Sequence, residues 1–219
     1  MTARRAVLLP VAAALAAVAA GCGSGPMTDQ SRDLPDFERV RSEGSIDVVV
    51  RSGGRVGPDV VVRAGEKVID DVGTEVVGDT LVVDTESRGL VIGPDGFENA
   101  RVVVDVPRLR GAEVEGSSDI ELAGLTGGAL DVDVQGSGDV QARGRVDSLD
   151  AHVQGSGDAD LGDLAAGRVA VGVEGSGDAE VHPVDELRAV VEGSGSISYS
   201  GNPRVTLSRT DGSGDIERD

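Results

Sequence analysis

A short motif, Gly-Ser-Gly-Asp or a close variant of it, recurs along the C-terminal half of the chain at a nearly constant interval. The first glycine of each copy stands at Gly116, Gly136, Gly155, Gly175, Gly193 and Gly212. Intervals of 18 to 20 residues are too long for nonapeptide calcium repeats and too short for propeller blades. They match one turn of a parallel β-helix made of three short strands and three bends. The repeat therefore predicts a β-solenoid with about 19–20 residues per coil.

The residues around each motif alternate between apolar and polar side chains, which is typical of a strand buried on one face. Apolar residues stand six, four and two places before the middle motifs: Leu130, Val132 and Val134; Leu149, Ala151 and Val153; Val169, Val171 and Val173; Leu187, Ala189 and Val191. Val205 and Leu207 lie one place out of this phase, as we expect of an irregular terminal coil. The alternation predicts inward columns of aliphatic side chains spaced about 4.8 Å apart.

The chain between Phe37 and Pro107 contains short β-branched segments bounded by Gly, Pro or Asp, including SIDVVVRSG, PDVVVRAG and ARVVVDVP. These are typical of strands, and a single helical turn is expected only around Val68 and Ile69. The chain has three aromatic residues and no Trp, so Val, Leu, Ile and Ala must form the core. We expect an all-β domain over residues 37–219, with irregular coils over 37–112 and regular coils over 113–219.

Two interpretations of the repeated motif remain open. As a joint, its glycines, including Gly157, adopt positive φ at a sharp bend, and the aspartate accepts hydrogen bonds from the N–H groups of the same bend. As a site, the aspartates form a column, interrupted at Ser196, whose carboxylates repel by about 1 kcal/mol per pair in water and attract calcium. We adopt the joint, with these turn-capping residues: Asp119, Asp139, Asp158, Asp178 and Asp215.

The N-terminus has the pattern of a bacterial lipoprotein. Arg4 and Arg5 precede an apolar, alanine-rich stretch that ends in VAAGC, which resembles a lipobox. We predict a signal peptide over residues 1–21, acylation of Cys22 and a Gly/Ser/Pro-rich tether over residues 22–36. The alternative is an ordinary secretory signal with an unrelated cysteine. The predicted location is the extracytoplasmic face of the cell membrane, held by the lipid anchor.

The composition argues against several classes of function. A formal net charge of -19 disfavours nucleic acid as a partner. His152 and His182 are interpreted as surface residues, and with one cysteine they make no closed zinc set; we predict no cofactor and no metal. No nucleophile elbow or phosphate loop is present, so we predict no enzymatic activity. A polysaccharide-active β-helix enzyme remains the rival hypothesis, with four outward arginines as candidates: Arg143, Arg145, Arg168 and Arg188.

The order of segments resembles a known family. FERVRSEGSIDVVVRSG, then DTLVV, then VVVDVPRLRGAEVEGSSDI and the repeated coils are similar to the GIN domain, named as an autotransporter adhesin head domain. The resemblance covers about residues 37–219 and implies a right-handed single-stranded β-helix, often lipid-anchored or secreted, with no catalytic residues to carry over. It implies a binding, adhesion-like or structural role toward an unknown surface glycan or protein. A calcium-stabilised surface module remains a further alternative.

Overall fold

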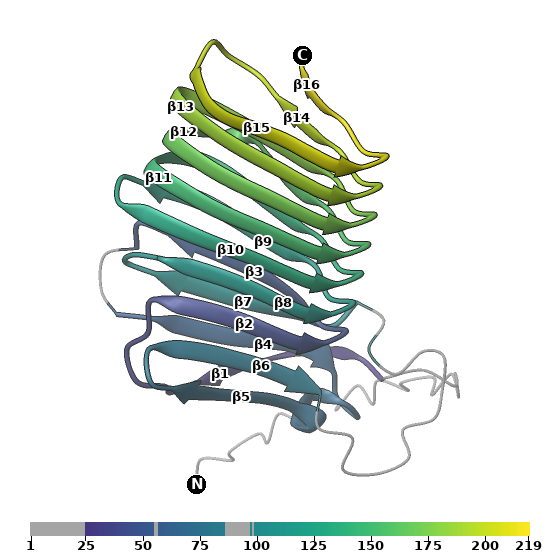
Figure 1. Ribbon diagram of the computed structural model, residues 1–219. Helices are drawn as coiled ribbons and strands as arrows, with labels where there is room; N and C mark the ends of the chain where they lie inside the picture. Colours follow the sequence, from purple (N-terminus) through teal and green to yellow (C-terminus); the bar gives the residue numbers. More distant parts are fainter. Residues whose placement is uncertain (1–24, 55–56, 86–96, 98) are drawn as a thin grey trace, which may run out of the picture.

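The computed structural model describes residues 25–54, 57–85, 97 and 99–219. They form one 16-stranded sheet that winds into a stack of coils (Figure 1). The elements follow one another as β1 (Met27–Arg32), β2 (Arg39–Gly44), β3 (Asp47–Ser52), β4 (Asp59–Gly65), the 3₁₀ turn η1 (Ile69–Asp71), β5 (Val72–Val77), β6 (Thr80–Thr85), β7 (Arg101–Val106), β8 (Gly111–Gly116), β9 (Ile120–Thr126), β10 (Ala129–Gly136), β11 (Val140–Gly155), β12 (Ala159–Gly175), β13 (Ala179–Gly193), β14 (Ile197–Tyr199), β15 (Arg204–Gly212) and β16 (Ile216–Arg218). The 3₁₀ turn η1 begins at Ile69 and so overlaps the helical turn expected around Val68 and Ile69.

Successive coils pair in parallel, with their motif glycines in register. Gly136 of β10 pairs with Gly116 of β8 and with Gly155 of β11, and Gly175 of β12 continues the column. The pairing of β12 with β13 shifts register between Leu161 and Ala165 and again between Ala166 and Arg168. These shifts divide the coil into three straight runs, as the spacing predicted. The parallel β-solenoid is therefore confirmed.

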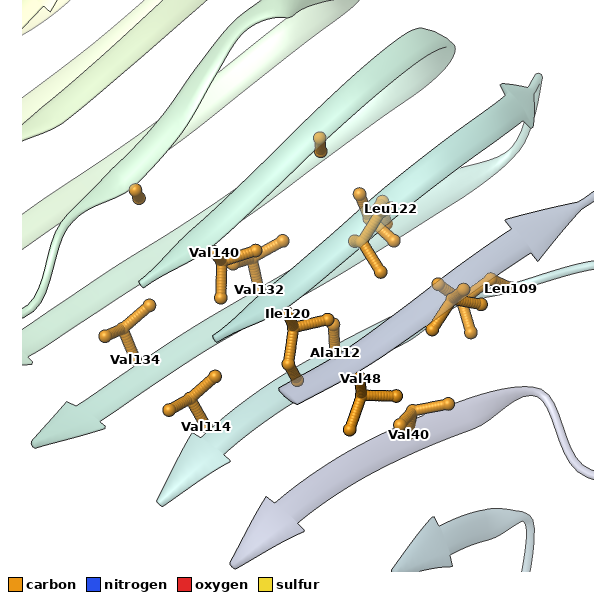
Figure 2. Close-up of a cluster of buried hydrophobic side chains, with 14 of the residues drawn as sticks. Val40, Val48, Leu109, Ala112, Val114, Ile120, Leu122, Val132, Val134 and Val140 are labelled. Carbon is orange, nitrogen blue, oxygen red and sulfur yellow. The ribbon is translucent and has the colours of Figure 1, made fainter. Parts of the chain in front are cut away.

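The interior consists of the predicted aliphatic columns. Val114, Val134 and Val153 lie in register on β8, β10 and β11, and none exposes more than 1% of its surface. Figure 2 shows Val114 and Val134 in one buried cluster with Ile120 and Val140 from the strands that follow the motif. Burial of each such side chain contributes about 1.5–3 kcal/mol. The repeated alternation thus builds one continuous core along the stack.

The last coil departs from the pattern as expected. The pairing of β13 with β15 shifts register between Leu187 and Arg188, and Val205 is 43% exposed. Ser208 and Thr210 occupy the places that Ala189 and Val191 hold in the preceding coil. Polar residues at these two places reduce the apolar surface that a further coil would have to cover.

The regular stack begins earlier than predicted. Gly44 of β2 pairs in register with Gly116 of β8, so β2 and β3 form a first coil within the segment expected to be irregular. The chain then leaves the stack and returns through β7, which pairs in parallel with β3 and antiparallel with β4. β4 and β5 of this excursion, together with β1, close the N-terminal end of the stack (Figure 1). In the sequence this coil lies outside the repeat, because Ile46 stands in place of the second glycine and a long interval precedes Gly116.

The predicted tether over residues 22–36 contains a strand and is shorter than expected. Residues Met27–Arg32 form β1, which pairs antiparallel with β4 from Met27 opposite Gly65 to Arg32 opposite Val60. The sequence MTDQSR carries no apolar alternation that would predict a strand. Backbone pairing with β4 is what holds this edge strand in place. The predicted signal peptide and Cys22 lie outside the described residues.

The two glycines of the motif are constrained differently. The first has positive φ in every copy, for example +123° at Gly155, where a Cβ would also lie 2.4 Å from the carbonyl oxygen of Gly136. Gly157 does not have positive φ, so that expectation was wrong. A Cβ on Gly157 would lie 2.1 Å from the carbonyl oxygen of Gly138 in the preceding coil. Close approach of two backbones, rather than a left-handed conformation, therefore excludes a side chain at the second glycine.

Replacing Gly157 by alanine should lower the free energy of unfolding by about 1–3 kcal/mol, because the two coils must separate to admit the methyl group. Gly172→Ala is the matched control. Its Cβ would lie 3.1 Å from Nδ1 of His152, whose half-exposed side chain can move aside. Urea unfolding followed by circular dichroism measures both. Equal midpoints for the two variants would contradict the close-approach explanation.

Candidate functional site

The motif corners align along one side of the stack, and we call this line the GSGD edge (residues 44–47, 116–119, 136–139, 155–158, 175–178, 193–196 and 212–215). Backbone hydrogen bonds join its coils. The carbonyl oxygen of Gly136 accepts the N–H groups of Ser156 and Gly157, at 2.9 and 3.1 Å. The same two-donor arrangement recurs on Gly116, Gly155, Gly175 and Gly193. The motif is thus a joint between coils as well as a bend within one.

The motif aspartates form a ladder of hydrogen bonds along this edge. The Oδ1 atoms of Asp119, Asp139 and Asp158 accept the backbone N–H of the next aspartate, at 3.0, 2.8 and 2.7 Å. Asp178 accepts the N–H of Ser196 at 2.6 Å. We expected these carboxylates to accept N–H groups of their own bend, but the donors belong to the following coil. Because each corner is exposed, the ladder faces solvent.

The ladder ends differ from the predicted set. Asp47, which the sequence reasoning missed, accepts the N–H of Asp119 at 3.3 Å and begins the ladder. The signal was Gly44-Ser45-Ile46-Asp47, a variant of the motif. At the other end, the backbone carbonyl of Asp215 accepts the N–H of Ile197 at 2.9 Å. Its carboxylate makes no hydrogen bond with the described part of the chain.

Two shallow openings flank the GSGD edge. One, of about 440 Å³, is lined by Asp158, Asp160, Asp178, Glu180, Ser196, Ser198 and Glu217 among others. The other, of about 360 Å³, is lined by Asp47, Asp119 and Glu121 together with Asn99 and Arg101. Over the residues that the structure describes, no group of three or more His, Cys, Asp or Glu side chains is arranged to hold a metal ion. Calcium binding stays the alternative to the joint interpretation.

The four outward arginines do not meet in one place. Arg143 pairs with Glu121, and Arg145 is exposed on the same strand, β11. Arg168 and Arg188 line a groove of about 290 Å³ with Asp131, Asp150 and Glu186. The groove brings both charges together over β10–β13, so each cation has acidic neighbours.

The two histidines lie apart. His152 Nε2 is 3.2 Å from Asp150 Oδ1, and the ring lies against Gly172 on the next strand. Burial raises the pKa of the neighbouring Asp133 carboxyl, and the charge of His152 partly opposes this. His182 is half-buried near the loop that contains Gly201. Neither histidine adjoins the GSGD edge.

The described residues include no helix long and apolar enough to cross a membrane.

Asp158→Ala should lower the free energy of unfolding by up to about 1 kcal/mol, because the N–H of Asp178 loses its acceptor at a corner where water competes. Asp158→Asn should cost less, since an amide oxygen can accept the same bond and one mutually repelling charge is gone. Urea unfolding measures the difference.

Millimolar calcium should raise the melting temperature of the parent only slightly. A large, saturable rise that magnesium cannot reproduce and that Asp158→Asn abolishes would establish a metal ladder instead.

Comparisons with known proteins agree with this architecture. A "putative adhesin" from Bacteroides fragilis is 20% identical with a TM-score of 0.72, over 89% of this chain and 97% of that chain. A "putative adhesin" from Parabacteroides distasonis is 22% identical with a TM-score of 0.54, over 90% and 98%. A "putative lipid binding protein" from the same species is 20% identical with a TM-score of 0.50, over 90% and 98%. At these identities the likeness shows the fold alone.

No curated protein matches the sequence. Residues 36–203 match the family described as "Putative auto-transporter adhesin, head GIN domain". This match spans most of the chain and includes every coil from β2 to β14. The chain therefore belongs to the GIN-domain family of adhesin head domains.

Proposed function

We propose that the protein is a lipid-anchored, extracytoplasmic β-solenoid that binds a surface glycan or protein without catalysis. The observation that carries the proposal is a column of acceptor side chains in register beside the GSGD edge. We call it the carboxylate–amide column: Glu43, Glu115, Gln135, Gln154, Glu174, Glu192 and Asp211. Its members recur at the spacing of neighbouring strands, about 4.8 Å. A repeated surface of this kind suits an extended partner with repeated hydrogen-bond donors.

The charge of the column favours a donor-rich partner over a polyanion. Arg41 lies 2.7 Å from Glu113 and 3.6 Å from both Glu43 and Glu115, and Arg209 pairs with Asp211 at the other end of the column. Three carboxylates around one guanidinium leave the group net negative, and burial raises the pKa of Glu115 while Arg41 opposes this. Carboxylates and amide oxygens accept hydrogen bonds from sugar hydroxyls or from basic side chains. Neutral glycans and basic protein surfaces are therefore the partner classes we propose.

An anchor at Cys22 would orient the stack. β1 begins at Met27, and five residues span at most about 18 Å. The end of the stack formed by β1 and β5 would then lie near the membrane. The opposite end, with β15 and β16, would point away from it (Figure 1). The carboxylate–amide column would run outward from the membrane between these ends.

Cys22→Ala should release the protein into the medium or leave it unprocessed, because no acyl chains would hold it. Membrane fractionation and mass spectrometry of the N-terminal peptide measure this, with Ser24→Ala as the control that stays anchored. A Cys22→Ala protein that fractionates with membranes like its parent, together with no acyl mass on the parent, would refute the anchor.

Charge reversal should show whether the column binds the partner. Labelled protein is applied to intact cells and to an array of neutral glycans. Glu174→Arg with Glu192→Arg should reduce binding about tenfold or more, because two acceptors become repelling donors. The control is Asp160→Arg with Glu180→Arg, which changes the same two coils on the other side of the GSGD edge. Equal binding by both double variants would reject the column. Release of reducing ends from a polysaccharide, lost in Arg188→Ala, would favour the enzyme instead.

A further inference from the structure

A further opening, at the start of the regular coils, is lined by more arginines than acidic residues. It measures about 410 Å³ and lies between the segment before β8 and the turn from β9 to β10. Three arginines line it, Arg39, Arg108 and Arg110, together with Asp131 and the Gly127–Gly128 turn. We call it the arginine pocket. Its volume is within the range of small-molecule sites, and the chain around it has 39 acidic residues against 20 basic ones.

Two of the arginines are held in place by carboxylates. Arg39 Nη1 lies 3.0 Å from Asp131 Oδ2, and Arg110 Nε lies 2.9 Å from Glu38 Oε2. A Cβ on Gly111 would stand 2.7 Å from Cζ of Arg39, so this glycine is what lets the guanidinium cross β8 and reach β10. Each guanidinium has five N–H donors, and one bond leaves the others free for a ligand. Both groups are therefore oriented before any ligand arrives.

The third arginine has no acidic partner among the described residues. Arg108 is exposed and makes no hydrogen bond or ion pair with them. Asp131 and Glu38 pair with the other two guanidinium groups, and the carboxylate of Asp147 accepts the N–H of Gly128. An anion is the ligand that would pair with the Arg108 guanidinium.

The glycine turn keeps the opening clear. Gly127 and Gly128 have φ of +66° and +78°, and a Cβ on either would meet nothing within 4 Å. Their backbone donors are already used. The N–H of Gly127 bonds the carbonyl of Arg145 at 2.8 Å, and that of Gly128 bonds Asp147 Oδ2 at 2.9 Å. An anion in this pocket would therefore be held by guanidinium groups.

We propose that the arginine pocket binds an acidic saccharide unit through its carboxylate or phosphate group. A guanidinium group presents a fork of two parallel N–H donors, which match two oxygens of a carboxylate or of a phosphate. Asp131, half-exposed beside the arginines, can accept a hydroxyl of the same ligand, which favours a sugar over a bare anion. The proposal goes beyond the proposed function: it adds a second site, for an acidic ligand, separate from the carboxylate–amide column.

Calorimetric titration of the purified protein tests the pocket, with glucuronate, glucose 6-phosphate and neutral glucose as probes. At least one acidic sugar should bind about tenfold more tightly than glucose, and physiological salt should weaken it. Arg108→Ala should weaken that binding about tenfold, and Arg108→Lys less, because it keeps the charge and loses the fork. Arg188→Ala, which removes the same charge from β13, three strands along from Asp131, is the matched control and should change the affinity less than about twofold.

Three results would overturn the pocket: glucose binding as well as both acids, Arg108→Ala leaving the affinity unchanged, or Arg188→Ala weakening it as much. The last would mean general charge attraction. The relative affinities of glucuronate and glucose 6-phosphate assign the carboxylate or the phosphate. If titration fails while the protein still binds cells through the column, the pocket is wrong and the binding function stands. If titration succeeds and cell binding is absent, the pocket stands and the proposed binding function is wrong.

Discussion

Backbone hydrogen bonding between coils at the GSGD edge is the interaction on which the structure depends. Five of the first-glycine carbonyls, from Gly116 to Gly193, accept two N–H groups from the coil that follows, for example those of Ser156 and Gly157 on Gly136. Bonds of about 3 Å bring the two backbones so close that a Cβ at Gly157 would lie 2.1 Å from a carbonyl oxygen. From Gly138 to Gly214, glycine is thus needed at the second-glycine position, because a Cβ there would meet the backbone of the preceding coil. The aspartate that follows adds one more hydrogen bond between the same coils, so the residues that form the turn also hold the coils together.

This joint fixes the register of everything inside the stack. Because the motif glycines align, residues at equal distances from them also align, and Val114, Val134 and Val153 form one buried column. Small, branched aliphatics fill these columns, since each column repeats at strand spacing, and Phe37 is buried with them. The two ends of the stack need separate solutions. Antiparallel strands β1, β4 and β5 close one end, and polar residues on β15 finish the other.

The same repetition shapes what the surface can do. Where the repeat is regular, outward side chains form uniform columns, and the carboxylate–amide column is one of them. Where the repeat is interrupted, unlike residues meet. Gly111 lets Arg39 cross a strand, and the Gly127–Gly128 turn leaves space beside Arg108 and Arg110. Both proposed binding surfaces follow from this contrast between a regular stack and its irregular first coils.

The sequence by itself determined the fold class, the coil length and the inward residues, because a repeat and a period-two alternation are local patterns that survive without knowledge of contacts. Cys22 and the anchor remain predictions from the same kind of pattern. Tertiary structure alone decided which atoms meet between coils. It placed Gly44 against Gly116 across a long excursion, turned the aspartates toward the next coil, and made β1 a strand through backbone pairing that its polar side chains do not announce. It also gathered Arg39, Arg108 and Arg110 from two segments far apart in the chain, since stacking brings together residues that no sequence period connects.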